Sequence, residues 1–342
     1  MNFNEMKYKV MYLKKYIGKK KVALWGCGTI GEILIEVLKV LNIPCEICLD
    51  NNVAKQLSSF KGIDIKSPEY LNGKSQDIYV LVAMTYYYSE VLIQLQEYGY
   101  LVEEKDFYYF GKFKDINIEL IQDYSDSFGN QIIGTPKYIK SRIEFKGRNN
   151  KIFFGTNVFL QQCNIIFYGN NGYCYIGNDS HYKGQIFIGS YCSVNIGKRL
   201  IVTNNCFISV AEKTDVTIGD DCMFATNNQL RSHDSHPIFD IESGKRLNVS
   251  KSIKVEDHVW LAYGAVLLSG AWIQTGSIIG HSSVVKSKIP NNCIAVGSPA
   301  RVIKRNIAWD KMNLQLMSYY LDKSDYVTDR KYWKYTTEED LK

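Results

Sequence analysis

Several features that would assign a protein to a common class are missing from this sequence. No run of eighteen apolar residues occurs in its 342 residues, and the opening stretch MNFNEMKYKVMYLKKYIGKKK has no apolar core of the signal-peptide kind. Lysine and arginine exceed the acidic residues only modestly and form no basic tract apart from Lys19-Lys20-Lys21, which disfavours nucleic-acid binding and leaves anionic small ligands open. We therefore expect a cytoplasmic globular protein without a membrane span, long enough for about two domains.

The sequence also lacks a cysteine framework. Its nine cysteines are an odd number and are scattered, which is typical of reduced thiols packed as small apolar residues. Cys45 and Cys48 form a CxxC pair, but they fall in an expected strand, where residues three apart point to opposite faces. This spacing disfavours redox or zinc chemistry at the pair.

The clearest regularity present is a period of six between Val255 and Lys288. An aliphatic residue recurs at every sixth position: Val255, Leu261, Leu267, Ile273, Ile279 and Val285. The residues four places further on are mostly small: Val259, Ala265, Ala271, Ser277, Ser283 and Ile289. This period predicts a β-helix whose short strands turn a corner after each hexad, with the aliphatic residue inside and the small residue at the corner. A repeat specifies a scaffold rather than a chemistry, so a purely structural solenoid is an alternative.

A less regular form of the pattern precedes this block. Three isoleucine–glycine pairs share one six-residue lattice: Ile176-Gly177, Ile188-Gly189 and Ile218-Gly219. Glu212 does not fit this lattice and Ile196-Gly197 lies off it, so we expect an imperfect coil. Leu230 and Val255 are not separated by a multiple of six, which predicts an insertion between the two blocks.

That insertion is where we expect the chemistry. Residues 231–248 read RSHDSHPIFDIESGKRLN, which is polar, rich in turn formers and contains two of the five histidines. A loop that leaves a rigid solenoid is a frequent place for function.

The N-terminal part has a different pattern. Residues 1–18 predict an amphipathic helix, and a strand candidate at Lys21–Trp25 ends in Gly26-x-Gly28-x-x-Gly31, followed by a helix and a second strand closing at Asp50. This is the context of a dinucleotide-binding fingerprint, in which the glycines admit a pyrophosphate and Asp50 accepts hydrogen bonds from a ribose. The βα alternation stops near residue 110, at about half the usual length. A domain that only packs, one that binds a nucleotide or nucleotide sugar, and one that performs NAD redox chemistry are the alternatives.

Residues 141–305 resemble the hexapeptide-repeat, left-handed β-helix acyltransferases, in the branch of the galactoside, xenobiotic and polysaccharide O-acetyltransferases. The matching segments are DVTIGDDCMF (215–224), SHDSHPIFD (232–240), VWL (259–261), IIGHSSVV (278–285) and IPNNCIAVGSPARVIK (289–304). The last segment is the most specific, because its GSPAR element closes the coil in this family. A small Rossmann-like domain before such a coil is also similar to sugar-modifying acetyltransferases that bind nucleotide sugars.

The resemblance implies an acetyl-CoA donor, a homotrimer with active sites between subunits, and a histidine general base. His236, followed by Pro237, matches the catalytic position, and an imidazole that titrates near neutrality suits proton removal from a sugar hydroxyl. His233 is the second candidate, and Asp234 is expected to position one of the two rings. A structural role for His236 is one alternative. A zinc site that joins His233, His236 and His258 is the other.

The resemblance also implies substrate residues. Asn205 matches an asparagine that contacts the acceptor sugar, with a coil-turn residue as the alternative. Trp260 matches an aromatic residue of the acceptor and donor site, where an indole can stack on a sugar, and a trimer-interface residue is the alternative.

For the donor, the resemblance implies CoA phosphates near Arg301 and Lys304. Backbone along the pantetheine arm is expected at Gly264, Gly280 and Ser282. Two departures affect this region: Ala262 stands where the family usually has glycine, and His281 stands where it usually has a small residue.

The fold we expect is an α/β Rossmann-like domain (1–115), a linker (116–140), a left-handed parallel β-helix (141–305) and a C-terminal tail (306–342). The tail contains a helical stretch, Met312 to Leu321, that we expect to cap the coil. The activity we expect is acetyl-CoA-dependent O-acetylation of a sugar in a surface polysaccharide, such as capsule, O-antigen or sialic acid, without a metal. The alternatives are an N-acetyltransferase for a nucleotide amino sugar, a zinc-dependent hydratase and a catalytically silent scaffold.

Overall fold

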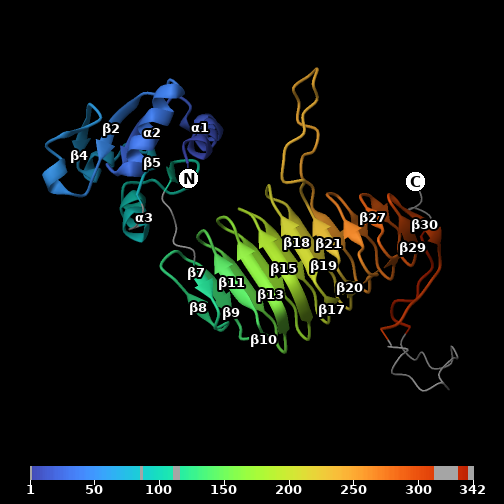
Figure 1. The fold of residues 1–342 in the computed structure, drawn as a ribbon. Helices are drawn as coiled ribbons and strands as arrows, with labels where there is room; N and C mark the ends of the chain where they lie inside the picture. Colours follow the sequence, from blue (N-terminus) through green and yellow to red (C-terminus); the bar gives the residue numbers. More distant parts are fainter. Residues whose placement is uncertain (1, 85–87, 111–115, 312–329, 338–342) are drawn as a thin grey trace, which may run out of the picture. The chain divides into compact units, whose positions relative to one another are not determined.

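The computed structural model describes residues 2–84, 88–110, 116–311 and 330–337. The chain divides into two compact units, Met1–Lys114 and Asp115–Lys342 (Figure 1). Each unit has a hydrophobic core of its own.

The first unit is an α/β domain around a six-stranded sheet. The strand order is β3-β4-β2-β1-β5-β6, with β1 (Lys21–Trp25), β2 (Cys45–Leu49), β3 (Ser59–Phe60), β4 (Ile63–Lys66), β5 (Ile78–Val82) and β6 (Phe107–Tyr109). The helices are α1 (Phe3–Ile17), α2 (Thr29–Val40) and α3 (Tyr88–Glu97), with short 3₁₀ turns at Val53–Lys55 and Pro68–Leu71. The central strands β1 and β5 are parallel and almost wholly buried, as expected for strands covered on both faces.

The N-terminal helix forms as its sequence predicts. Asn2 and Glu5 make a reciprocal capping box, with the Glu5 N–H donating to Asn2 Oδ1 at 3.0 Å. The helix buries the predicted apolar face: Met6, Val10, Leu13 and Ile17. The hairpin of β3 and β4 was not expected from the sequence pattern.

The prediction that Cys45 and Cys48 point to opposite faces is wrong. Val22 pairs with Cys45 but Ala23 pairs with Ile47, so Glu46 is an extra residue that bulges from the strand. The two thiols therefore meet, and Cys48 also interacts with Cys27. All nine cysteines are free thiols, as expected.

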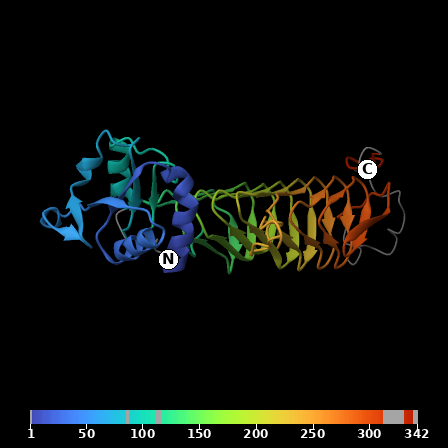
Figure 2. The same cartoon turned by 90° about the horizontal axis from the view of Figure 1, so that it is seen from above.

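The second unit is a parallel β-helix made of three stacks of strands (Figures 1 and 2). The strands up to the loop are β7 (Ile116–Ile118), β8 (Tyr124–Ser125), β9 (Gln131–Ile133), β10 (Lys137–Ile139), β11 (Arg142–Phe145), β12 (Lys151–Phe154), β13 (Phe159–Phe167), β14 (Tyr173–Ile176), β15 (His181–Ile188), β16 (Ser193–Ile196), β17 (Ile201–Asn204), β18 (Cys206–Val210), β19 (Asp215–Ile218), β20 (Met223–Thr226) and β21 (Gln229–Arg231). After the loop come β22 (Ile253–Val255), β23 (Trp260–Leu261), β24 (Val266–Leu267), β25 (Trp272–Ile273), β26 (Ile278–Ile279), β27 (Val284–Val285), β28 (Lys288–Ile289), β29 (Ile294–Gly297) and β30 (Ala300–Lys304).

We name the stacks by their members. The first stack contains β17, β20, β23, β26 and β29, and the second contains β18, β21, β24 and β27. The third contains β8, β9, β12, β14, β16, β19, β22, β25 and β28. The long strands β13 and β15 run through both the first and the second stack, because β15 pairs with β17 at one end and with β18 at the other. The antiparallel strand β30 closes the end of the coil against β29.

Residues 253–297 form what we call the tight coil, in which the period of six is confirmed from Val255 to Val285. Its strands pair with residues 18 places further on, as three hexads require, and the spacing falls to 16 only in the last turn. The predicted inward aliphatic residues and the small corner residues are all buried.

Residues 116–231, which we call the wide coil, have a longer turn. Hydrogen bonds between successive turns here commonly join residues 22 apart. Four-residue strands that bury two side chains recur in it, as in β14 and β16. The six-residue lattice is therefore not the true period in this half, and Ile196 pairs with Ile176 although it lies off that lattice.

One expected boundary differs from the structure, and one expected helix cannot be compared with it. Residues 116–140, expected as a linker, contain four strands, of which β9 and β10 pair with β12 and β13 of the coil. Their turn formers connect short strands, so composition alone suggested a linker. The helical stretch predicted at Met312 to Leu321 lies outside the described residues.

Candidate functional site

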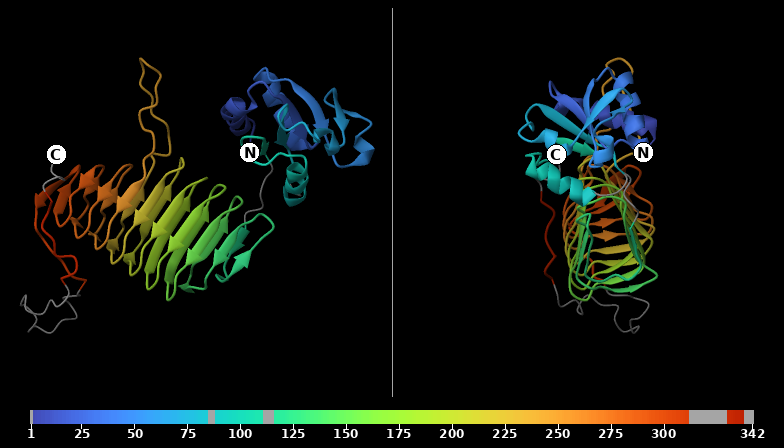
Figure 3. Two further views of the ribbon diagram at one scale, coloured as in Figure 1. Left: turned by 180° about the vertical axis from the view of Figure 1, so that it is seen from behind. Right: turned by 90° about the vertical axis from the view of Figure 1, so that its left-hand side faces the viewer.

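The loop 232–252 joins β21 to β22 and projects from the coil (Figures 1 and 3). Its two arms pair at a bridge between Phe239 and Arg246, and the Leu247 N–H donates to the Ile238 carbonyl at 2.8 Å. At the tip, Asp240 Oδ1 accepts hydrogen bonds from the Ser243 N–H and hydroxyl. The insertion is thus an ordered hairpin-like excursion.

Glu212 anchors the base of this loop. Its carboxylate accepts hydrogen bonds from the Arg246 guanidinium, at 2.9 Å for one pair of atoms, and from the Ser250 hydroxyl. The Arg246 charge and these hydrogen bonds lower the pKa of Glu212 to about 2. Glu212, which lies off the six-residue lattice, thus helps to tie the insertion to the coil.

Asn248 connects the two arms. Its side-chain amide donates to Asp234 Oδ2 and to the His236 carbonyl, both at 2.9 Å, while its Oδ1 accepts from the Ile238 N–H at 2.7 Å. Asp234 is therefore held by Asn248, and no described hydrogen bond joins Asp234 to either imidazole.

His233 is engaged at both ring nitrogens. Nδ1 accepts the Ser235 N–H at 3.1 Å, so Nε2 carries the proton and donates to Ser209 Oγ at 2.9 Å. Partial burial, followed by the charge of Arg231, lowers the pKa of His233. A neutral imidazole with both nitrogens occupied suits a structural role better than proton transfer.

His236 differs, because its side chain is exposed and no described group hydrogen-bonds its ring. Its main chain is fixed by the Asn248 contact and by its own N–H, which donates to the Asp234 carbonyl at 2.8 Å. The preceding residue, Ser235, has φ of 65°, a left-handed conformation that side-chain-bearing residues rarely adopt. This turn presents a free imidazole on a fixed backbone.

The other candidate residues lie on the first stack and at its corner with the second. Asn205 Nδ2 donates to Asn227 Oδ1 at 2.8 Å, and Asn227 Nδ2 donates to the Tyr263 hydroxyl at 3.0 Å. The Tyr263 ring stacks on His281, with centroids 5.0 Å apart. The side-chain oxygen Oδ1 of Asn205 has no described partner, so it is available as an acceptor at the end of this row of side chains.

Local geometry explains why glycine occupies two positions at this corner. Gly264 has φ of 67°, and a Cβ on Gly280 would lie 2.5 Å from Val296 Cγ1. Ser282 is also left-handed, with φ of 53°. On β30, Arg301 and Lys304 are exposed, and Arg301 Nη1 donates to the Ala300 carbonyl at 3.0 Å.

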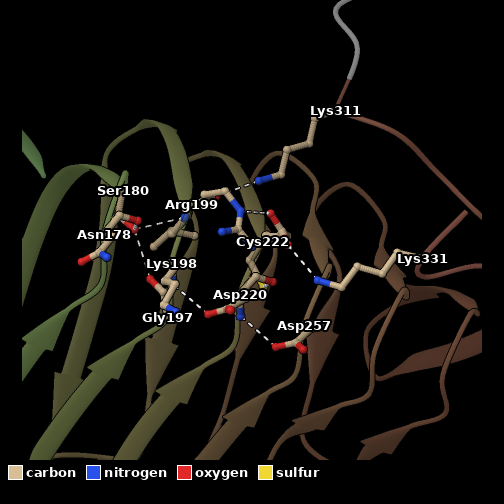
Figure 4. A network of polar contacts seen from close by, with 12 residues as sticks. Asn178, Ser180, Gly197, Lys198, Arg199, Asp220, Cys222, Asp257, Lys311 and Lys331 are labelled. Carbon is tan, nitrogen blue, oxygen red and sulfur yellow. Dashed lines mark hydrogen bonds and ion pairs between the residues drawn. The ribbon is translucent and has the colours of Figure 1, made fainter. Parts of the chain in front are cut away.

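The tail returns to the corner between the third and first stacks. We call residues 306–311 and 330–337 the strap. Figure 4 shows two of its lysines there: Lys311 Nζ donates to the Arg199 carbonyl at 2.7 Å, and Lys331 lies 3.8 Å from Asp221, which also pairs with the Arg199 guanidinium. In the same picture, Asp220 and Asp257 accept backbone N–H groups of the preceding turn at 2.8 Å.

The strap also surrounds His258. Trp309 stacks on one face of this imidazole at 4.1 Å and Tyr332 stacks on the other at 4.4 Å. Trp309 contacts Trp260 as well, with centroids 5.7 Å apart. A cavity of about 170 Å³ remains at this corner, lined by Asp221, His258, Trp309, Asp310, Lys311, Tyr332 and Trp333.

The candidate residues therefore form two groups on one chain. His233, Asp234 and His236 lie on a loop between the second and third stacks, whereas Asn205 and Trp260 lie on or beside the first stack. No described contact joins the two groups. His258 is enclosed by the strap and does not join His233 and His236, and no group of three or more His, Cys, Asp or Glu side chains in the described ranges is arranged to hold a metal ion.

In the first unit, the glycine turn has the expected form. A Cβ on Gly26 would lie 2.5 Å from the Ala83 carbonyl oxygen, and one on Gly31 would lie 2.3 Å from the Gly26 carbonyl oxygen, whereas Gly28 faces open space. Asp50 is already engaged, because its carboxylate accepts the Asn52 N–H and Lys55 Nζ, both at 2.9 Å. A ribose would have to compete with these partners.

Sequence reasoning missed Glu212, Asn248, Trp309 and Tyr332. Glu212 lies off the six-residue lattice, but so does Ile196, and that lattice is not the true period of the wide coil. The other three depend on contacts across many residues and carry no periodic signal.

Comparisons with known proteins agree with the resemblance of the coil to acyltransferases. A family model described as "C2185-like, N-terminal" matches residues 18–105. The polysialic acid O-acetyltransferase of Neisseria meningitidis is 35% identical over 167 residues, which is 48% of this chain and 77% of that protein. The one from Escherichia coli O1:K1 is 37% identical over 46% of this chain, but the match spans only 48% of that relative's length.

Solved structures show the same relationship. The crystal structure of the polysialic acid O-acetyltransferase OatWY is 31% identical, with a TM-score of 0.53 over 57% of this chain and 93% of that one. The chain thus belongs to the left-handed β-helix, hexapeptide-repeat O-acetyltransferases, a family of acyltransferases. Within the described part of the chain, no helix is long and apolar enough to cross a membrane.

Proposed function

We propose that this chain is an acetyl-CoA-dependent O-acetyltransferase that modifies a hydroxyl on a sugar of a surface polysaccharide, such as capsule, O-antigen or sialic acid. The observation that carries the proposal is the free imidazole of His236 on a fixed turn of the loop 232–252, in a chain whose relatives are polysialic acid O-acetyltransferases. A cytoplasmic location fits a donor of this kind.

His236 is the general base of this proposal. Its ring accepts the proton of the acceptor hydroxyl as that oxygen attacks the thioester carbonyl. The new C–O bond forms, the C–S bond breaks, and the proton passes from the imidazolium to the leaving thiolate. Backbone N–H groups of the coil would stabilise the oxyanion of the tetrahedral intermediate. No covalent intermediate on the enzyme is needed.

The substrates are assigned to the other group of residues. The Asn205 carbonyl oxygen is free to accept a sugar hydroxyl, and the Trp260 indole offers a face for the sugar ring. Arg301 and Lys304 provide exposed charges for the CoA phosphates, and the corner of Gly264, Gly280 and Ser282 lies beside the donor arm.

Because the two groups do not meet within one chain, we propose that the site forms between copies. The His236 loop of one copy would face the Trp260 stack of the next in a closed ring, which for this family is a trimer.

An N-acetyltransferase that acts on a nucleotide amino sugar is the second candidate. It is supported by the open space at Gly28 and by the start of α2, where no side chain caps the helix. Turnover of an amine-bearing nucleotide sugar, in preference to hydroxyl acceptors, would favour it.

The test is thiol release from acetyl-CoA in the presence of sialic acid oligomers, capsular oligosaccharides and nucleotide sugars. His236→Ala should lower kcat by about 100-fold or more. His181→Ala is the matched control, because His181 lies on the coil surface and contacts Gln161 and Phe159. Undiminished turnover in His236→Ala, or no turnover with any acceptor, would contradict the proposal.

A further inference from the structure

Trp309 is the least exposed aromatic residue of the strap, with 9% of its surface accessible. Its ring lies nearly parallel to His258, at an interplanar angle of 12°, and tilted by 43° against Trp260. The same side chain thus contacts the coil corner and the aromatic residue expected at the acceptor site.

Two hydrogen bonds fix Trp309 across 51 residues of sequence. Its indole N–H donates to the His258 carbonyl at 3.0 Å, and His258 Nε2 donates to the Trp309 carbonyl at 3.0 Å. His258 Nδ1 is buried without a described partner, which agrees with a neutral ring protonated at Nε2. Tyr332 closes the other face of His258 and donates its hydroxyl to Asp221 at 2.6 Å.

Trp260 itself has few constraints from the coil. It points outward from the two-residue strand β23, between Met223 and Ile278 of the neighbouring strands. Its indole N–H has no described hydrogen-bond partner. The contact with Trp309 is therefore the one described ring contact that limits its rotamers.

We infer that Trp309 is a positioning residue, which holds the Trp260 indole in the orientation that receives the acceptor sugar. The inference rests on the proposed role of Trp260 and goes beyond it, because it assigns a function to the strap. Holding a side chain before binding removes the entropy that binding would otherwise cost. Loss of this restraint should raise the acceptor KM by about 3-fold to 10-fold and leave the acetyl-CoA KM nearly unchanged.

A strap that only caps the solenoid would behave differently, because removing a cap lowers stability without a selective effect on one substrate. The inference therefore needs a readout that separates acceptor binding from folding.

A double-mutant cycle supplies that readout. Acceptor kcat/KM is measured for the parent, Trp309→Ala, Trp260→Ala and the double variant, with thermal unfolding recorded for each. If Trp309 acts through Trp260, then Trp309→Ala has no further effect on acceptor kcat/KM once Trp260 is alanine. In the chain that keeps Trp260, Trp309→Phe restores part of the acceptor kcat/KM that Trp309→Ala loses. Trp333→Ala is the matched control, because Trp333 belongs to the strap but is 42% exposed. Equal, independent losses from the two alanine changes would overturn the inference.

A second measurement does not depend on turnover. The full chain is labelled with 5-fluorotryptophan, and its five resonances are assigned by single substitutions. Trp309→Ala should shift or broaden the Trp260 resonance, whereas Trp333→Ala should leave it in place. An unchanged Trp260 resonance in Trp309→Ala would overturn the inference even in an active enzyme. Absence of turnover in the parent would instead contradict the proposed function, and the resonance would still report on the restraint.

Discussion

The wide coil and the tight coil share the same three stacks but differ in the length of their turns. Hydrogen bonds between turns commonly span 22 residues in the wide coil, whereas paired strand residues lie 18 apart in most of the tight coil. The wide coil has four-residue strands that bury two side chains each, such as β16 and β19, whereas the tight coil has two-residue strands that bury one, such as β23 and β24. The step between them spans 37 residues, and the loop 232–252 accounts for the excess.

This difference teaches where an insertion can enter such a coil. The stacks continue across the step, since β19 pairs with β22, β20 with β23 and β21 with β24. The turn length therefore changes at a single corner, and the loop 232–252 leaves the coil there without interrupting a stack. The wide coil supplies Glu212 and Ser209 to hold the loop, while the tight coil carries Trp260 and the strap contacts.

The largest expected effect compares core leucines of the two halves. Leu160→Ala in the wide coil and Leu267→Ala in the tight coil each remove a fully buried side chain, which should cost about 3 kcal/mol. Because the turns contact mainly their neighbours, each change should speed amide hydrogen exchange chiefly within its own half. Equal acceleration throughout the coil after either change would mean that the two halves unfold as one unit.

A smaller effect tests the spacing of the tight turns. In Gly280→Ala the new Cβ would lie 2.5 Å from Val296 Cγ1 of the next turn, so we expect a loss of about 1–3 kcal/mol in the free energy of unfolding, measured in urea. Gly244→Ala in the loop is the control, since nothing lies within 4 Å of a Cβ there, although its φ of 64° carries some strain. A larger loss at Gly244 than at Gly280 would show that backbone strain, rather than turn spacing, dominates.

The smallest effect is a pH dependence of strap docking. Burial lowers the pKa of His258, the Trp309 carbonyl raises it in part, Lys311 lowers it further, and Asp221 and Asp310 raise it slightly. An undocked His258 takes up a proton below about pH 6.5, whereas the docked ring resists it. Docking should thus be fully stable above that pH and weaken as the pH falls below it.

Tryptophan emission recorded from pH 8 to pH 5 follows this change. His258→Gln keeps a donor for the Trp309 carbonyl but cannot titrate, so its profile should be flatter than the parent's. An identical profile in the two proteins would assign the pH dependence to another group.

The fold was largely predictable from the sequence because its main determinants are periodic. Val255 to Val285 repeat with the spacing that three equal sides require, and the glycine turn of the first unit lies between a strand and a helix as its motif demands. The period predicted for the wide coil is wrong, because its extra residues leave the inward positions aliphatic without a fixed spacing, as Ile196 illustrates.

The site was predictable only in part. Residue type and loop position singled out both histidines. The sequence could not show that the His233 ring is engaged while the His236 ring is free, because this depends on Ser209, which lies 24 residues from His233 in the sequence. The strap could not be predicted, since Trp309 meets His258 only after the coil has formed. A search for periodicity cannot detect a contact that the tail makes once.

The most direct test of the shared site uses two impaired variants in one assembly. His236→Ala lacks the base but keeps the Trp260 stack, and Trp260→Ala lacks the indole but keeps the base. When the two are co-expressed and the mixed trimers are purified, each trimer holds one intact site of three, which should restore roughly a third of the parental rate of thiol release from acetyl-CoA. Mixed oligomers no more active than either variant alone would contradict a site built from two copies.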